Sequence, residues 1–259
     1  MRSVVMTIGF LGALSVYIGP LIAGAAGGAQ SRLTPLCDAV RARAAETVRT
    51  LLAQGASVEE RTPDGSTPLF FAARKGDMPI LAMLIDHHAD VDAADTLGWT
   101  PLHVTALAGQ VEAMRMLIAH GAHVSASDED GWTPLHVAAL QDQADCVHVL
   151  VSAGAERDAG DKDGWTPLHA AASKGSMASA AALLADSVDV NAVESTGQTP
   201  LHFAAARGFT DLARLLLRRG ADARAEDDSL RTPAALAVAK GYFELARVVA
   251  PPDSAGNER

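Results

Sequence analysis

The sequence predicts an all-α fold, a solenoid of stacked helix-turn-helix units, on three observations. First, the dipeptide Thr-Pro recurs with a constant pitch of 33 residues, beginning at Thr34, Thr67, Thr100, Thr133, Thr166, Thr199 and Thr232. A fixed pitch of this length is typical of repeat architectures. Second, similar small and apolar residues follow each Thr-Pro. Third, aromatic residues make up only 4% of the chain, which disfavours a sheet because strands favour aromatic and β-branched residues.

The first 29 residues differ from the rest of the chain. Arg2 precedes an apolar run that carries no further charge until Arg32 and is broken at Gly19–Pro20. A basic start, an apolar stretch and small residues before a cleavage point are typical of a secretory signal peptide, here with cleavage favoured after Ala29. Residues 4–22 are also long enough to span a bilayer, so an uncleaved membrane anchor is the alternative. We expect an exported protein, periplasmic or secreted, in the first case and a membrane-anchored one in the second.

The repeats are predicted to cover residues 30–252, followed by a flexible tail at 253–259. Each copy begins with Thr, a favoured N-cap residue, and with Pro, which suits the first helical position because its missing N–H would have no partner there. Small residues follow, and in most copies a Gly then closes this first helix in a left-handed conformation. A second helix carries apolar residues at helical spacing and ends at a second Gly in most copies. Asp-Gly pairs such as Asp130-Gly131 mark a tight turn before the next Thr-Pro.

With these residues in place, the chain resembles the ankyrin-repeat family. The pattern is met by "DGWTPLHVAALQDQADCVHVLVSAGAERDA" and by "TGQTPLHFAAARGFTDLARLLLRRGADARA", and seven copies follow one another without insertion. The resemblance covers residues 31–252. It implies a curved stack of helix pairs with β-hairpin fingers along one edge. It also implies a concave surface, formed by fingers and first helices, that usually holds another protein.

Some copies depart from the repeat pattern. Arg43 and Asp142 stand where other copies have the first Gly, His88 and Ser187 replace the second Gly, and Leu230 replaces the Gly of the turn. Each inner departure is expected to cost up to about 1 kcal/mol. The first and last copies are the least regular, and atypical end copies are expected to be polar caps that close a hydrophobic stack.

Histidines form two groups that could suggest a metal site. The first recurs at the pitch of the repeat: His103, His136, His169 and His202. Neighbouring copies lie about 10 Å apart, too far to share one ion, and the family resemblance implies a hydrogen-bonding framework role instead. The second group clusters around the ends of two second helices: His87, His88, His120 and His123. We expect exposed helix ends there, with opportunistic metal binding as the alternative, and predict no physiological metal site.

Charge and missing motifs argue against other classes of function. The chain has 21 basic and 31 acidic residues, a net charge of −10, which disfavours nucleic acid as a partner. Nucleophile-elbow, zinc-protease, phosphate-loop and Cys-x-x-Cys motifs are absent, so we expect no catalytic residues and no cofactor, and an enzyme is only a third alternative. Cys37 and Cys146 fall three copies apart, on the order of 30 Å, so both are expected to be reduced and buried.

Three tryptophans fall at one position of consecutive copies. Trp99, Trp132 and Trp165 each precede a Thr-Pro, and the resemblance places that position on the inner side of the finger. We predict a stripe of partner-binding anchors, because Trp is enriched at binding hot spots. The alternative is that neighbouring fingers pack these indoles against each other. The other partner-binding residues predicted are Leu107, Leu140, Asp130 and Asp163, an apolar centre and an acidic rim.

The function predicted from these features is non-catalytic binding of a protein partner in the concave groove by a monomeric chain. The rival prediction is a membrane-tethered scaffold, in which the uncleaved N-terminal segment brings the chain to a membrane.

Overall fold

Fourteen helices, arranged as seven pairs, form the described part of the chain. The computed structural model describes residues 34–185 and 187–251. The predictions for residues 1–29 and for the tail at 253–259 therefore lie outside the described residues. Within the described ranges, no helix is both long enough and apolar enough to cross a membrane.

Each pair consists of a first helix, which begins at the Pro of Thr-Pro, and a second helix. The first helices are α2 (Pro35–Arg41), α4 (Pro68–Lys75), α6 (Pro101–Ala108), α8 (Pro134–Leu140), α10 (Pro167–Lys174), α12 (Pro200–Arg207) and α14 (Pro233–Ala239). The second helices are α3 (Ala45–Ala53), α5 (Met78–Asp86), α7 (Val111–Ala119), α9 (Ala144–Ser152), α11 (Met177–Leu183), α13 (Thr210–Arg218) and α15 (Phe243–Val249).

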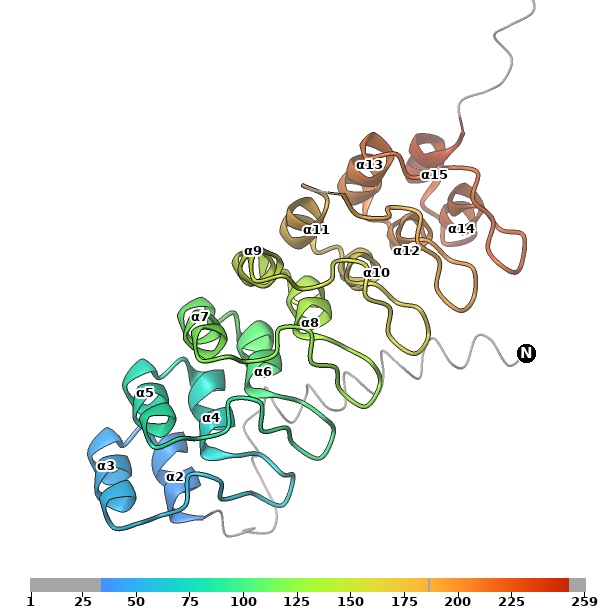
Figure 1. Cartoon of the computed structure of the whole chain (residues 1–259). Coiled ribbons are helices and arrows are strands. Elements are labelled where there is room, and N and C mark those ends of the chain that lie inside the picture. Colours follow the sequence, from blue (N-terminus) through green and yellow to red (C-terminus); the bar gives the residue numbers. More distant parts are fainter. Residues whose placement is uncertain (1–33, 186, 252–259) are drawn as a thin grey trace, which may run out of the picture. The chain divides into compact units, whose positions relative to one another are not determined.

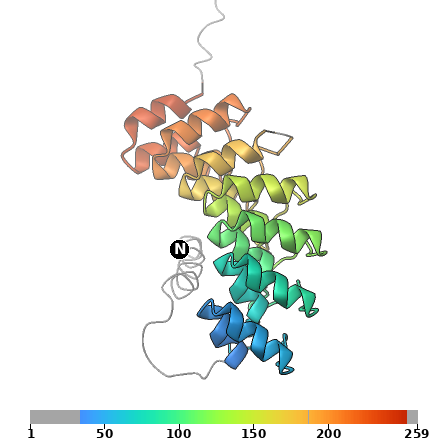
Figure 2. The same ribbon diagram turned by 90° about the vertical axis from the view of Figure 1, so that its left-hand side faces the viewer.

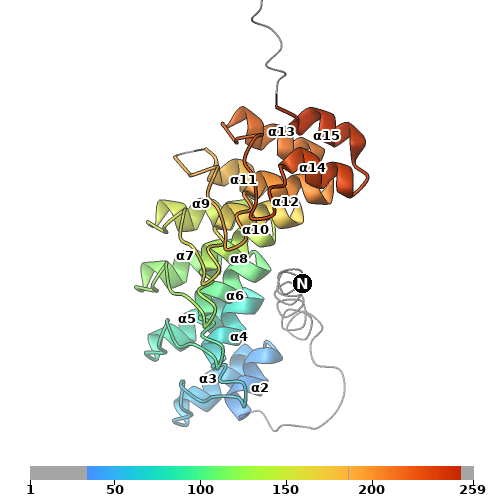
Figure 3. The same ribbon diagram turned by 90° about the vertical axis from the view of Figure 1, so that its right-hand side faces the viewer.

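The pairs stack in chain order into two rows. Each first helix contacts the first helix of the next pair, and each second helix contacts the next second helix. Figure 1 shows the two rows, with the loops between pairs projecting beside the first helices. The side views in Figures 2 and 3 show the same succession from α2 to α15. The predicted all-α stack of helix-turn-helix units is confirmed.

The start of each first helix has one cause, the Thr N-cap. In every copy this Thr has extended backbone angles and Pro occupies the first helical turn. In four copies a His at the third helical position completes a capping box, because its side chain accepts a hydrogen bond from the backbone N–H of the Thr. The predicted N-caps are therefore confirmed, and the histidine belongs to the helix start as well.

Left-handed backbone positions occur where the repeat pattern calls for Gly, whether or not Gly is present. Gly76 and Gly109, with φ of 62° and 66°, close the first helices of their copies as predicted. Four of the positions that lack Gly keep the same backbone conformation. Positive φ is found at Arg43 (58°), His88 (63°), Asp142 (55°) and Leu230 (56°). Stacking thus imposes the conformation, and these four residues carry its cost.

The loops that carry the predicted fingers need a correction. Residues 34–185 and 187–251 contain no β-strand, so the fingers are turn-closed loops and not β-hairpins. Each is closed by a backbone bond such as Asp128 N–H to the Trp132 carbonyl, 2.9 Å. Neighbouring fingers share backbone bonds such as Glu129 N–H to the Leu97 carbonyl, 3.0 Å. Such isolated bonds do not make a ladder.

The last copy also differs from the polar cap that the sequence predicts. Val238 occupies the place of alanines that are fully buried in copies two to six, yet it is 51% exposed because no further described helix covers it. Tyr242 and Phe243 beside it are 42% and 61% exposed. This end of the stack therefore exposes large apolar side chains next to charged ones such as Lys240 and Glu244. The first copy, by contrast, exposes Arg43 and Glu46.

Candidate functional site

A carboxylate at the base of each middle finger connects that finger to the one before it. One oxygen of Asp128, Oδ1, accepts the backbone N–H groups of Asp130 and Trp132 at 2.9 and 2.8 Å. The other, Oδ2, accepts the indole N–H of Trp99 at 3.0 Å. Asp161 repeats the arrangement one copy later and accepts the indole N–H of Trp132 at 2.8 Å. One oxygen thus holds the backbone of its own finger and the other holds the indole of the finger before it, so these carboxylates are structural.

Burial affects these carboxylates chemically. It raises the pKa of Asp128 and Asp161 above the usual range of an aspartate, and the hydrogen bonds from the finger backbone and from the indoles offset part of this rise. A carboxylate in a dry site is retained only when donors satisfy it. The donor set at each site supplies that compensation.

The histidine row forms a second set of links between copies. The backbone N–H of Thr100 donates to Nδ1 of His103 at 3.1 Å, so Nδ1 must be the unprotonated nitrogen. The proton is then on Nε2, which donates to the backbone carbonyl of Trp132 in the next finger at 2.9 Å. Links of the same kind join His136 to the Trp165 carbonyl at 2.8 Å and His169 to the Gln198 carbonyl at 3.1 Å.

Because these imidazoles are buried and bonded as neutral rings, their pKa values are depressed. Desolvation lowers the pKa of His103, His136 and His169 to about 4, against a partial rise from the backbone carbonyls they contact. A protonated ring would also lose the Nδ1 acceptor that holds the Thr N–H. The framework role that the family resemblance implied for this histidine row is confirmed by these contacts.

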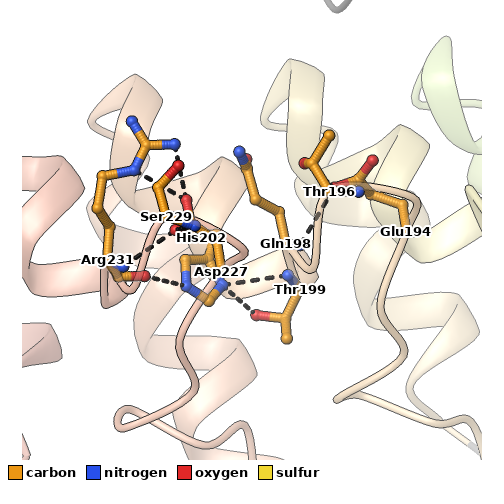
Figure 4. Close-up of polar contacts among 8 residues, drawn as sticks. All are labelled: Glu194, Thr196, Gln198, Thr199, His202, Asp227, Ser229 and Arg231. Carbon is orange, nitrogen blue, oxygen red and sulfur yellow. Dashed lines mark hydrogen bonds and ion pairs between the residues drawn. The ribbon is translucent and has the colours of Figure 1, made fainter. Parts of the chain in front are cut away.

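The last two fingers show how the finger carboxylate adapts to other neighbours. Figure 4 shows His202 reaching the Arg231 carbonyl of the final finger, a contact of 3.0 Å. In that finger Asp227 accepts two side-chain N–H groups of Arg231 at 2.9 and 2.7 Å. Burial alone would raise the pKa of Asp227, but the bonds from Arg231 and the finger backbone lower it below the usual range. In the preceding finger, Glu194 accepts the backbone N–H of Gln198 at 3.1 Å.

The predicted tryptophan anchors are buried, and this corrects their assignment as partner-binding residues. Trp99, Trp132 and Trp165 are only 2%, 1% and 5% exposed. Each indole lies against the imidazole that follows it, with centroids 5.6, 5.4 and 6.2 Å apart. Trp165 also contacts Phe203, with centroids 4.7 Å apart. The indoles have almost no area left for a partner. They pack against imidazoles and Phe203, whereas the alternative predicted contacts between the indoles of neighbouring fingers.

The remaining predicted residues divide between core and surface. Leu140 is 4% exposed, and its carbonyl accepts the Ser176 hydroxyl of the next copy at 3.0 Å, so it is a packing residue and the prediction of a contact there is wrong. Leu107 is half-buried at the end of α6. Asp130 and Asp163 are exposed at neighbouring finger tips. These three residues keep the surface that a contact requires.

The finger carboxylates are the residues whose role the sequence prediction missed. Asp95 and Asp161 are each only 8% exposed. A signal for their role was present. An acidic residue stands four positions before the residue that precedes Thr-Pro in five copies, at Asp95, Asp128, Asp161, Glu194 and Asp227. Because this carboxylate recurs at the same pitch as the framework residues, the pattern indicates a structural role for it.

The cysteines and the other histidines were also predicted from sequence. Cys37 and Cys146 are free and buried, as expected, and burial raises the pKa of Cys146 to about 11. His87 and His120, of the second histidine group, are exposed and contact backbone carbonyls one turn earlier in their own helices. Over the described ranges, no set of three or more His, Cys, Asp or Glu side chains is arranged to hold a metal ion.

Comparison with known proteins agrees with the repeat pattern. A family model described as "Ankyrin repeats (3 copies)" matches residues 36–128, 87–161, 124–194 and 180–257. Comparison with curated proteins gives no match. The family matches together span most of the chain and coincide with the stacked helix pairs. The chain therefore belongs to the ankyrin-repeat family.

Proposed function

We propose that this chain is a non-catalytic module that binds another protein on the face formed by its first helices and fingers, centred on copies three to five. Ankyrin repeats are in general protein-interaction modules. The observation that carries the proposal is a division of roles within each finger. The indole and imidazole positions that recur are buried and hold the stack, whereas the finger-tip position two residues before each indole, which carries Leu97, Asp130 or Asp163, is exposed.

The variable tip lies two residues before Trp99 and at the matching place in later fingers. Leu97 is 37% exposed, and Asp130 and Asp163 are exposed beside it in the next two fingers. Leu107, half-buried at the end of α6, adds a further apolar side chain. An apolar contact bordered by charge is the usual composition of a selective protein interface.

Affinity capture from the native compartment tests this proposal. The double variant Asp130→Lys, Asp163→Lys is expected to fold normally, since both side chains are exposed, and to lose the partner recovered by the natural chain. The matched control is Glu112→Lys, Asp145→Lys, which makes the same change of charge on exposed positions of the second helices. Equal recovery of the partner by all three proteins would reject the proposed face. Equal loss of the partner in both variants would show that net charge, and not this face, determines binding.

We also propose that the N-terminal segment directs export. The basic start and apolar run of residues 2–29 support this, and N-terminal sequencing of the mature protein tests it. A chain that begins at Gln30 is the expected result. Retention of residues 1–29 in a membrane fraction would instead support the tethered scaffold, which the uncharged run over residues 4–22 favours.

A further inference from the structure

We infer that the edge of copies five to seven, where the first helices turn into the second helices, is a docking site for an extended acidic peptide segment that also carries apolar side chains. The inference rests on the proposed function, because it assigns a second contact surface to the same protein-binding module. It is carried by a row of exposed cations and by two hollows beside them that aromatic and other apolar side chains line together with polar ones.

The cations occupy the last helical turn, or the position just after it, in three consecutive first helices. Lys174, Arg207 and Lys240 stand at the same phase of the repeat, and all three are exposed. None of them makes a hydrogen bond or an ion pair with another described residue. Their side chains are therefore available to a ligand.

Aromatic side chains cover the turns in these copies. A Cβ added to Gly175 would lie 2.8 Å from Cε1 of Phe209, and one added to Gly208 would lie 2.7 Å from Cε1 of Tyr242. In copies two and three, glutamines cover the corresponding glycines. Gly241, in the last copy, has no described atom within 4 Å of such a Cβ. The turn edge is thus polar in copies two and three and aromatic at the turns of Gly175 and Gly208, which follow Lys174 and Arg207 of the row.

Two hollows open along this aromatic edge. One, of about 310 Å³, is lined by Tyr242 and Phe243, and the other, of about 250 Å³, by Met177 and Phe209, while Thr210 lines both. Met177 and Phe243 are 38% and 61% exposed. Apolar side chains of a partner could therefore be buried at two places, one copy apart.

Charge selects the kind of partner. Asp211 and Glu244 also line the hollows, but each forms an ion pair within its own helix, with Arg214 at 3.4 Å and Arg247 at 2.9 Å. The three cations of the row are left without a counter-charge on a chain whose net charge is −10. Nucleic acid is disfavoured by that overall charge, whereas a short acidic segment would meet only the local row.

The geometry also sets an expected spacing. Stacked helices lie about 8–10 Å apart, and an extended chain advances about 3.3 Å per residue. One copy therefore corresponds to about three peptide residues. The site would favour Asp or Glu at every third position, with apolar residues between them to enter the hollows.

Selection of a displayed random library of 12-residue peptides on the purified chain tests the inference. Enriched peptides should carry acidic residues at three-residue spacing with apolar residues between. Synthetic fluorescein-labelled copies should bind at least about tenfold more weakly to the variant Lys174→Glu, Arg207→Glu, Lys240→Glu. Binding should weaken as NaCl is raised. The variant Met177→Ser, Phe243→Ser should weaken binding about fivefold, since it removes apolar area only.

The matched control is Arg115→Glu, Arg218→Glu, Arg224→Glu, which makes the same charge change at exposed positions outside the row, and binding should change less than about twofold. If the triple Glu variant fails to fold by circular dichroism, the Lys174→Gln, Arg207→Gln, Lys240→Gln variant replaces it.

The inference is overturned if no peptide is enriched, if enriched peptides lack acidic residues, or if the row variant binds them as well as the natural chain does. Tighter binding of a labelled 12-nucleotide oligo(U) would assign the row to nucleic acid instead. Self-association in sedimentation that the row variant abolishes would assign it to a second copy. If the Asp130→Lys, Asp163→Lys variant weakens peptide binding and the row variant does not, the proposed function is supported and only the docking site at this edge is rejected.

Discussion

At the residue scale, the repeated side chains divide into those whose role could be predicted and those whose role could not. The histidine row was assigned correctly, since the resemblance of the "TPLH" segments implied a framework role. The tryptophans were assigned wrongly. The position of a residue within the repeat determines which equivalent residues it aligns with in other copies. It does not determine which residues of neighbouring copies bury its side chain. For Trp99 the cover includes Asp128, 29 residues later in the chain, which local spacing does not reveal.

The buried histidines predict a loss of stability in acid. Their pKa is about 4 in the folded chain against 6.5 for a free imidazole, so the unfolded chain takes up protons first as pH falls. The stabilisation is complete above pH 6.5 and declines between pH 6.5 and 4. It amounts to on the order of 3 kcal/mol for each fully affected histidine. The raised pKa values of Asp128 and Asp161 oppose this decline at the acidic end.

Urea unfolding at pH 7 and at pH 4.5 measures this loss. A His136→Gln variant should lose less stability between the two pH values than the natural chain, because it has one buried imidazole fewer. His148→Gln, at an exposed position of α9, is the matched control and should behave as the natural chain does. A pH dependence that is the same in all three proteins would contradict the assigned role of the row.

The buried thiols give a second residue-scale prediction. Burial raises the pKa of both Cys37 and Cys146, and a thiol reacts as its thiolate. Ellman's reagent should therefore label neither cysteine in the folded chain at pH 8, and should titrate two thiols after denaturation without a reductant. Rapid labelling of the folded chain would show that the stack opens at these copies.

At the element scale, the boundaries of the first helices were predictable because each is fixed by a local residue, Thr at the start and, in most copies, a left-handed residue at the end. The finger strands were not, because strand pairing requires a ladder and neighbouring fingers share isolated backbone bonds such as Glu129 to Leu97. The left-handed positions persist at His88 and Leu230 without Gly. Stacking therefore overrides the local preference of those residues.

Replacement of these residues by Gly should stabilise the fold. His88→Gly and Leu230→Gly should each raise the free energy of unfolding by about 0.5–1 kcal/mol, because Gly adopts positive φ without steric cost. The matched opposite is Gly121→Ala. Its φ is 91° and no atom lies within 4 Å of the added Cβ, so a loss of about 1 kcal/mol would come from the backbone alone. Thermal or urea unfolding measures all three, and a stability loss on either Gly substitution would contradict the explanation.

At the scale of the whole stack, the interfaces between copies are unequal. Copies three to five are joined both by indole-to-carboxylate bonds and by histidine-to-carbonyl bonds. Copies one and two have Cys37 and Phe70 at the histidine position, so these links are replaced there by packing. The stability of a repeat protein is approximately the sum of the stability of each repeat and of the interfaces between neighbouring repeats. Because the central interfaces have both kinds of bond, the centre should be the most stable region.

Hydrogen exchange measures this gradient directly. Backbone amides of α6, α8 and α10 should exchange most slowly, and those of α2, α3 and α15 should exchange first. Uniform protection along the stack, or slowest exchange in an end copy, would show that the hydrogen-bond rows do not determine the stability of the interfaces.

The central claim is that recurring buried residues hold the stack while varying exposed residues recognise the partner. The dissociation constant of the captured partner, measured for Trp132→Phe and for Asp130→Lys, Asp163→Lys, tests it most directly. Trp132→Phe deprives Asp161 of a donor and should lower stability by on the order of 2 kcal/mol, yet leave the dissociation constant within about twofold. The aspartate variant should bind at least about tenfold more weakly with unchanged stability. The reverse result, with affinity lost on Trp132→Phe and kept by the aspartate variant, would contradict the account.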